Sequence, residues 1–163
     1  MKRSIVAGVA AALWLAACGT PPPGPGTARD DVLRDWGRPT ARHTLPMGAE
    51  RLEYASGPYG RTTWMIDIDA SGRVVQARQV LTEAEFMQVQ VRAAGGLTRD
   101  ELLRWIGRPG ERRHGGWAGG EVWSWRYPTN DCLWFQVSVA DSGAVGGGAF
   151  AIDPVCDAPN DRD

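Results

Sequence analysis

The chain has 163 residues, of which 43% are hydrophobic and eight are tryptophan, so it can form one domain with a real core or two very small ones. Its 18 Lys and Arg residues nearly balance its 19 Asp and Glu residues. Such a balance provides no strong basic field and therefore argues against nucleic acid as a partner.

The first 18 residues have the features of a secretory signal peptide. Lys2 and Arg3 form a basic start, an apolar run extends from Ile5 to Trp14, and small residues lead up to Cys18. The run is shorter than the roughly 20 apolar residues that a membrane-spanning helix needs. Its end, LAAC, resembles a bacterial lipobox, which implies cleavage before Cys18 and its acylation by fatty acids such as palmitate. Several acyl chains would anchor the protein stably; the alternative is a spare cysteine near an ordinary cleavage site.

Cleavage after residue 17 would leave 146 residues, with 16 basic and 19 acidic side chains. In lipoproteins of this kind an Asp after the lipidated cysteine is the usual signal for retention in the inner membrane, and Gly19 stands there instead. The resemblance therefore implies an outer-membrane protein that is lipid-anchored on the periplasmic side. Residues 18–26 are rich in Pro and Gly and are expected to form an extended tether.

Residues 29–39 and 99–109 are nearly the same. They read RDDVLRDWGRP and RDELLRWIGRP, with seven identities at an offset of 70. We expect a short helix in each copy, over 29–36 and 99–106, because apolar residues recur at helical spacing and a G-R-P stop follows. A Gly-rich ligand loop is the alternative for G-R-P, although a single glycine makes no phosphate cradle.

The chain therefore predicts two tandem repeats. The expected divisions are a signal peptide (1–17), the lipidated cysteine and tether (18–26), repeat 1 (27–80), repeat 2 (81–157) and a polar tail (158–163). A further helix over 83–91, with Thr82 and Glu85 as a capping box, is expected to open repeat 2 and has no counterpart in repeat 1.

Three strand-like runs follow the shared helix in each repeat. They cover 50–56, 62–69 and 73–80 in repeat 1, and 121–128, 132–139 and 144–152 in repeat 2. Ile66 and Ile68 alternate with Asp67, which predicts an antiparallel sheet buried on one face only. Gly72 and Gly143 lie where tight hairpins need a positive φ. The expected fold class is α+β: ααβββ units with helices on a three-stranded antiparallel sheet, the first helix missing in repeat 1.

Cys132 and Cys156 flank the last predicted hairpin. In an oxidising periplasm we expect them to form a disulfide, the alternative being two separate buried thiols. The chain has no C-x-x-C pattern and only two histidines, so no metal site or cofactor is predicted.

His43 and His114 each follow an arginine, at an offset of 71, on the connection between helix and sheet. A catalytic or metal-binding pair is one interpretation, but repeat symmetry alone explains why they recur. No set of residues matches a catalytic motif, so we predict no catalytic residues and no enzymatic activity.

One segment has the composition of a binding site. Trp117 lies in a Gly-rich stretch close to Arg112 and Arg113, and tryptophan with arginine is typical of interaction hot spots. The alternative is that Trp117 folds back over the core. Trp123 and Trp125 share one strand face and are expected to be core residues.

Repeat 2 resembles the SmpA/OmlA class of small outer-membrane lipoproteins, which includes BamE-like accessory subunits of the β-barrel assembly machinery. The matching features are Gly96-Leu97-Thr98, Ile106-Gly107, the aromatic pair at 123 and 125, and LWFQVSVADSGAV. The resemblance implies two helices packed on a three-stranded antiparallel sheet. Repeat 1 departs from the pattern, with Ala28 in place of the family's threonine, and the assembly subunit carries a single copy. Two copies side by side are similar to the secreted β-lactamase inhibitor proteins, which bind proteins through a joined concave sheet.

The sequence therefore favours a non-catalytic outer-membrane lipoprotein with a periplasmic or outer-membrane protein partner. Its expected role is an interaction or structural one in outer-membrane biogenesis, with β-barrel assembly as the specific case. Alternatives are an inhibitor or modulator of a periplasmic enzyme, and an accessory lipoprotein of a transport or cell-wall system. Whether the duplication provides a binding platform or only stabilises the fold stays open.

Overall fold

The computed structural model of the protein describes residues 20–56, 61–115 and 119–156. Cys18 and Trp117 therefore lie outside the described residues. The elements of repeat 1 are α1 (Arg29–Trp36), β1 (Ala41–Thr44), a 3-10 turn (Pro46–Gly48), β2 (Glu50–Ala55), β3 (Thr63–Ile68) and β4 (Val74–Gln79). Those of repeat 2 are α2 (Glu83–Ala94), α3 (Arg99–Ile106), β5 (Glu111–His114), β6 (Glu121–Arg126), β7 (Leu133–Val139) and β8 (Val145–Ile152).

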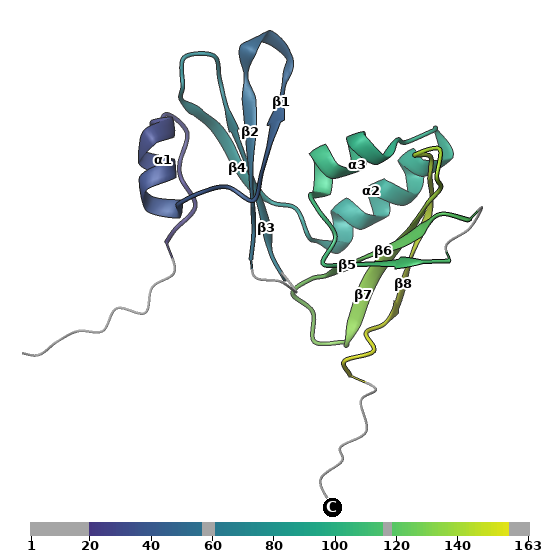
Figure 1. Ribbon diagram of the computed structural model, residues 1–163. Coiled ribbons are helices and arrows are strands. Elements are labelled where there is room, and N and C mark those ends of the chain that lie inside the picture. The colour runs from purple at the N-terminus through teal and green to yellow at the C-terminus, as the bar shows by residue number, and fades with distance from the viewer. Residues whose placement is uncertain (1–19, 57–60, 116–118, 157–163) are drawn as a thin grey trace, which may run out of the picture.

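The fold is α+β, with two antiparallel four-stranded sheets in the orders β1-β2-β3-β4 and β5-β6-β7-β8. Figure 1 shows four successive layers: α1, the first sheet, the pair α2 and α3, and the second sheet. The two sheets share no strand pairing, so the described residues form no single joined sheet. None of the described helices is both long and apolar enough to cross a membrane.

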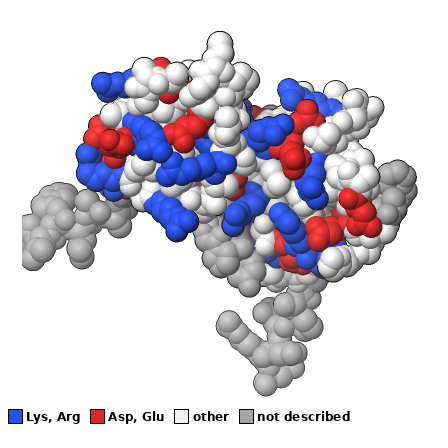
Figure 2. Space-filling model, turned by 45° about the horizontal axis from the view of Figure 1, so that its top comes forward, with Lys and Arg blue, Asp and Glu red and all other residues white. Residues whose placement is uncertain are grey.

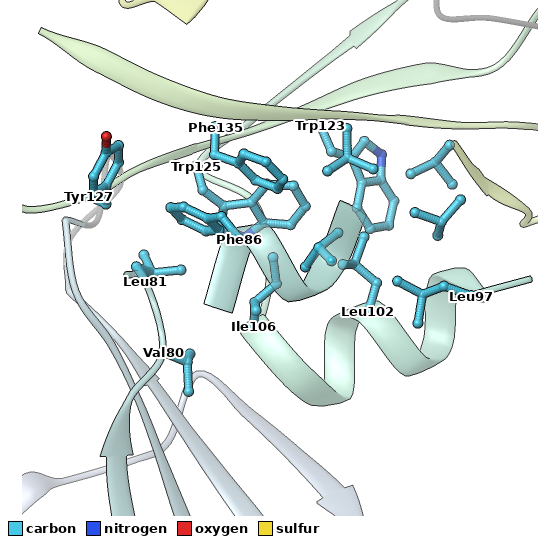
Figure 3. Packing of buried hydrophobic residues seen from close by; sticks show 14 of the residues in the cluster. Val80, Leu81, Phe86, Leu97, Leu102, Ile106, Trp123, Trp125, Tyr127 and Phe135 are labelled. Atoms are coloured by element: carbon cyan, nitrogen blue, oxygen red, sulfur yellow. The ribbon is translucent and has the colours of Figure 1, made fainter. Parts of the chain in front are cut away.

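The larger core lies between α2, α3 and the second sheet. Phe86 stacks on Phe135 with ring centroids 4.3 Å apart, and Leu102 and Ile106 are fully buried. Figure 3 shows these side chains converging with Trp123. Trp123 and Trp125 are each 1% exposed, which confirms the expected core role of both β6 tryptophans. A smaller core joins α1 to the first sheet, with Val32 packed against buried residues of β2 and β3.

The ends of the two shared helices follow the sequence pattern. Each helix ends at a glycine with positive φ, 74° at Gly37 and 79° at Gly107. Gly107 also allows close packing, because a Cβ atom there would come within 2.9 Å of the Thr63 methyl group on the first sheet. The second repeat is therefore held directly against the first.

Two sequence expectations were wrong. Each sheet has four strands and not three, because β1 and β5 add a short edge strand where a connection was expected. The first sheet is also buried on both faces: Asp67, expected to face solvent, is 8% exposed, and Met65 on the same face is 1% exposed. The cause is packing of this face against the second repeat, whose core cluster includes Met65.

Candidate functional site

Two neighbouring clefts form a groove that begins where the repeats meet and continues along repeat 2. Their volumes are about 420 and 360 Å³, and Leu103 and Arg112 line both. The first cleft is also lined by Ala41, His43, Glu53, Arg108, Pro109, Gly110 and Glu111, and the second by Arg99, His114, Glu121, Trp123, Val139, Ala140 and Asp141. The groove thus follows β5 from repeat 1 to the β7–β8 turn. We call it the inter-repeat groove.

Arg112 lies at the centre of this groove. Its guanidinium stacks on the Trp123 ring, 4.2 Å from the ring centroid, although the side chain stays exposed. The Trp123 indole N–H donates to the Glu121 carboxylate at 2.6 Å, which fixes the ring. Arg112 is therefore held in place before binding, and a partner would lose less side-chain entropy in contacting it.

Glu53 joins the two repeats at the other end of the groove. Its carboxylate is 1% exposed, accepts the Arg108 backbone N–H at 3.2 Å and lies 3.1 Å from His43 Nε2. The Thr40 hydroxyl lies within 3.4 Å of it as well. A carboxylate buried this completely must keep such partners, because an unpaired buried charge is costly. Glu53 is therefore a fixed point between the repeats.

Sequence reasoning missed the roles of Glu53 and Arg108. Glu53 alternates with Leu52 and Tyr54 on a strand that was expected to expose one face. The repeat offered one signal: position 53 carries an acid where its counterpart in β6 is Ser124. A charged residue at a position that is small and neutral in the other copy indicates a different neighbour.

The structure separates the residues that the sequence had grouped. Arg112 and Arg113 are consecutive in β5 and point to opposite sheet faces, and Arg113 lies 5.1 Å from the Trp134 ring centroid, outside the groove. His43 pairs with Arg51 as the third residue of β1, whereas His114 pairs with Glu121 as the fourth residue of β5, so the two occupy different positions in their sheets and line different clefts. They do not form a pair, and their equal spacing in the sequence does not correspond to equal places in the two sheets.

The positive charge of this molecule is carried by arginine rather than lysine. Lys2 is the chain's only lysine. Figure 2 shows basic and acidic side chains interspersed over both halves of the visible face. Arginine provides planar, directional hydrogen bonding and stacks on aromatic rings, which suits protein contacts better than a diffuse basic field does.

Several acidic residues of the described chain pair with arginine or form turns. No group of three or more His, Cys, Asp and Glu side chains in that part of the chain could hold a metal ion. Burial raises the pKa of Asp67, but hydrogen bonds from Arg51 and Gln76 outweigh it and hold the pKa below its ordinary value. Asp69 accepts the Ser71 hydroxyl and backbone N–H bonds of its turn, which also lower its pKa.

The Cys132–Cys156 disulfide is formed, with the two Cα atoms 6.0 Å apart. It closes the open end of the β7–β8 hairpin, where the Asp153 N–H also donates to the Cys132 carbonyl at 2.8 Å. The bridge therefore connects the residue directly before β7 to the short turn that follows β8.

Comparison with known proteins adds little to this geometry. No protein-family model and no curated protein matches the chain. One solved structure, an extracellular protein containing a SCP domain from Bacillus anthracis str. Ames, is similar at 12% identity and a TM-score of 0.29. The alignment covers 80% of this chain and 44% of that one, so the chain spans less than half of its length. This likeness supports no conclusion about fold or function.

Proposed function

We propose that this protein is an outer-membrane lipoprotein, anchored through Cys18, that acts without catalysis as a protein-interaction component in outer-membrane biogenesis. Attachment to the β-barrel assembly machinery is the specific case to test first. The observation that carries the proposal is the inter-repeat groove, in which Arg112 is stacked on Trp123 and yet exposed. Such a fixed arginine with aromatic support is typical of the residues that dominate protein interfaces.

The test is a pull-down of the full-length lipidated protein from cross-linked membranes, read by mass spectrometry. Cys18→Ala removes the anchor, Arg112→Ala removes the groove cation, and Arg38→Ala removes an exposed arginine outside the groove. We expect recovery of β-barrel assembly subunits that Cys18→Ala and Arg112→Ala reduce and Arg38→Ala leaves unchanged. Recovery that Arg112→Ala does not alter would contradict the role of the groove.

The alternative, an inhibitor of a periplasmic enzyme, has a distinct outcome in the same experiment. It predicts recovery of one periplasmic enzyme, whose activity rises when the gene is deleted, with an unchanged outer-membrane barrier. The assembly proposal predicts sensitivity to vancomycin and detergent, with reduced levels of barrel proteins. The inhibitor model has less support here, because the two sheets are separate and form no joined concave face among the described residues.

A further inference from the structure

The four sheet edges differ in how they are protected against pairing with another strand. β1 and β5 have four residues each and carry arginine and histidine, and the edge strand β4 carries Arg78. β8 has eight residues, VGGGAFAI, with no charge and no proline. Natural proteins usually shorten or charge their edge strands to prevent strand addition, so β8 stands apart from the other three.

The register shows which backbone groups of β8 point outward. The Asp153 N–H donates to the Cys132 carbonyl, and Leu133, Trp134 and Phe135 oppose Ile152, Ala151 and Phe150. Hydrogen-bonded and non-bonded pairs alternate between antiparallel strands, so Gly148, Phe150 and Ile152 direct their N–H and C=O groups away from β7. The Gly148 carbonyl confirms this, because it accepts from the Gln90 side chain of α2 at 2.9 Å. No described residue bonds to the outward backbone groups of Phe150 and Ile152.

An exposed apolar side chain of α2 lies on the side of the helix above this edge. Among the strands of the second sheet, α2 lies nearest to β8 (Figure 1). The Gln90 side chain, which donates to the Gly148 carbonyl, marks the flank of α2 that faces the free edge of β8. At 100° per residue, Met87 lies about 60° from Gln90 and is 50% exposed, whereas Val91 points away from the sheet, opposite the buried side of the helix. A strand added beside β8 would run on the Met87 side of α2.

The position of α2 also disfavours a second copy of the chain as the partner of the β8 edge. If a second copy paired antiparallel through its own β8, both α2 helices would lie on the same sheet face, about one strand spacing of 5 Å apart. Packed helices need about 8–10 Å between their axes. An extended segment with no covering helix of its own meets no such obstacle.

We propose that the β8 edge binds an extended polypeptide segment by strand addition, and that apolar side chains at every second position of the segment pack against Met87. Ile152, which is 61% exposed, lies on the same face and extends the apolar contact. The opposite face of β8 carries Ala149 and Ala151, which leave room for varied side chains. The inference names the kind of partner for the proposed interaction role and rests on that role. Alternating apolar segments are the pattern of membrane β-barrel strands.

The experiment uses the full lipidated chain in detergent micelles and a synthetic peptide in which valine and threonine alternate, with terminal lysines for solubility. A scrambled peptide of the same composition controls for partition into the micelles. We expect the alternating peptide to bind and to slow hydrogen exchange at the Phe150 and Ile152 amides, which point outward. Failure of wild type to bind it, or protection elsewhere only, would overturn the proposal.

Three variants sharpen the test. Met87→Lys places a charge on the side of α2 above the β8 edge, and Val91→Lys places the same charge on an exposed position of α2 that points away from the sheet. Ile152→Pro removes an outward N–H that takes no part in pairing with β7. Met87→Lys and Ile152→Pro are expected to weaken binding by about tenfold, and Val91→Lys to leave it unchanged. Equal effects of both lysines, or a wild-type dimer that Ile152→Pro dissociates, would overturn the proposal. If the peptide binds but the pull-down recovers no assembly subunits, the proposed function has failed. If the pull-down recovers them but the peptide does not bind, the strand-addition proposal has failed.

Discussion

The two sheets have the same strand order and the same turn between their last two strands, but they are buried differently. The second sheet is covered on one face by α2 and α3, whereas the first lies between α1 and the second repeat. Counterpart positions therefore have different environments. Phe135 of β7 is fully buried under Phe86, while its counterpart Trp64 in β3 is only partly buried.

The difference follows from the number of helices in each repeat. Within the part of the chain that the structure describes, repeat 1 shows no helix equivalent to α2, and α1 is the helix that covers one face of its sheet. The opposite face would be exposed in an isolated unit, and the second repeat covers it. Duplication thus gives the weaker unit a second layer, which favours a stabilising role for the repeat in addition to any binding role.

The largest expected effect is on unfolding free energy, at a core position that is buried differently in the two sheets. Phe135→Ala should cost about 3–5 kcal/mol of unfolding free energy, because it leaves a cavity beneath Phe86. Trp64→Ala, at the counterpart position, should cost about 1–2 kcal/mol, because its ring is already partly in solvent. Urea unfolding followed by circular dichroism measures both. Equal losses would show that the two sheets do not differ in burial as described.

The next effect concerns the junction. Glu53→Ala should cost about 1–3 kcal/mol, because His43 and the Arg108 N–H lose their buried acceptor. Ser124→Ala, the counterpart in repeat 2, removes one hydrogen bond from Gln136 and should cost about 0.5–1.5 kcal/mol. Hydrogen exchange at the Arg108 amide separates a local from a global loss. Unchanged protection there in Glu53→Ala would contradict its role as the fixed point between repeats.

Most local structure was predictable from the sequence, because its causes are local. Four features depend on residues that are close together in the chain or opposed across one hairpin: the shared helices, the capping box at Thr98, the glycine turns and the Cys132–Cys156 disulfide. Trp123 and Trp125 were predictable as core because both lie on the apolar face of one strand. The two edge strands were not, because β1 and β5 are short and polar and show no apolar alternation.

The stacking of the repeats could not be predicted, because the buried face of the first sheet carries the residues of an exposed one. Glu53 and Asp67 indicate a solvent face until the end of α3 covers them. The inter-repeat groove could not be predicted for the same reason. Arg112 was predictable as a contact residue from its neighbours in the chain, but Glu53 and Arg108 come together only in the folded molecule.

Acid should weaken both sheets through one buried aspartate in each. Asp67 pairs with Arg51 at 2.5 and 2.8 Å, and hydrogen bonds from Arg126 lower the pKa of Asp153. Both pKa values lie below the ordinary 3.8 in the folded state, so the stability these pairs give is complete above that pH and is lost as the pH falls through the folded values. Unfolding free energy should therefore decrease below about pH 4. Asp67→Asn and Asp153→Asn should each flatten that decrease, and an unchanged slope in both would contradict the assignment.

The smallest expected effect compares the two shared helices at their first residue. Thr98 caps α3 through a capping box with Glu101, whereas Ala28, its counterpart before α1, has no side-chain cap. Both residues have the same extended backbone and a matching bridge to the hairpin turn, at Ala144 and Arg73. Thr98→Ala should therefore cost about 1 kcal/mol, and Ala28→Thr should stabilise by a similar or smaller amount. Thermal unfolding of the two single variants and their combination measures this. If Ala28→Thr destabilises the protein, α1 cannot accept a cap in this setting, and the difference between the helices lies in their surroundings rather than in the missing hydroxyl.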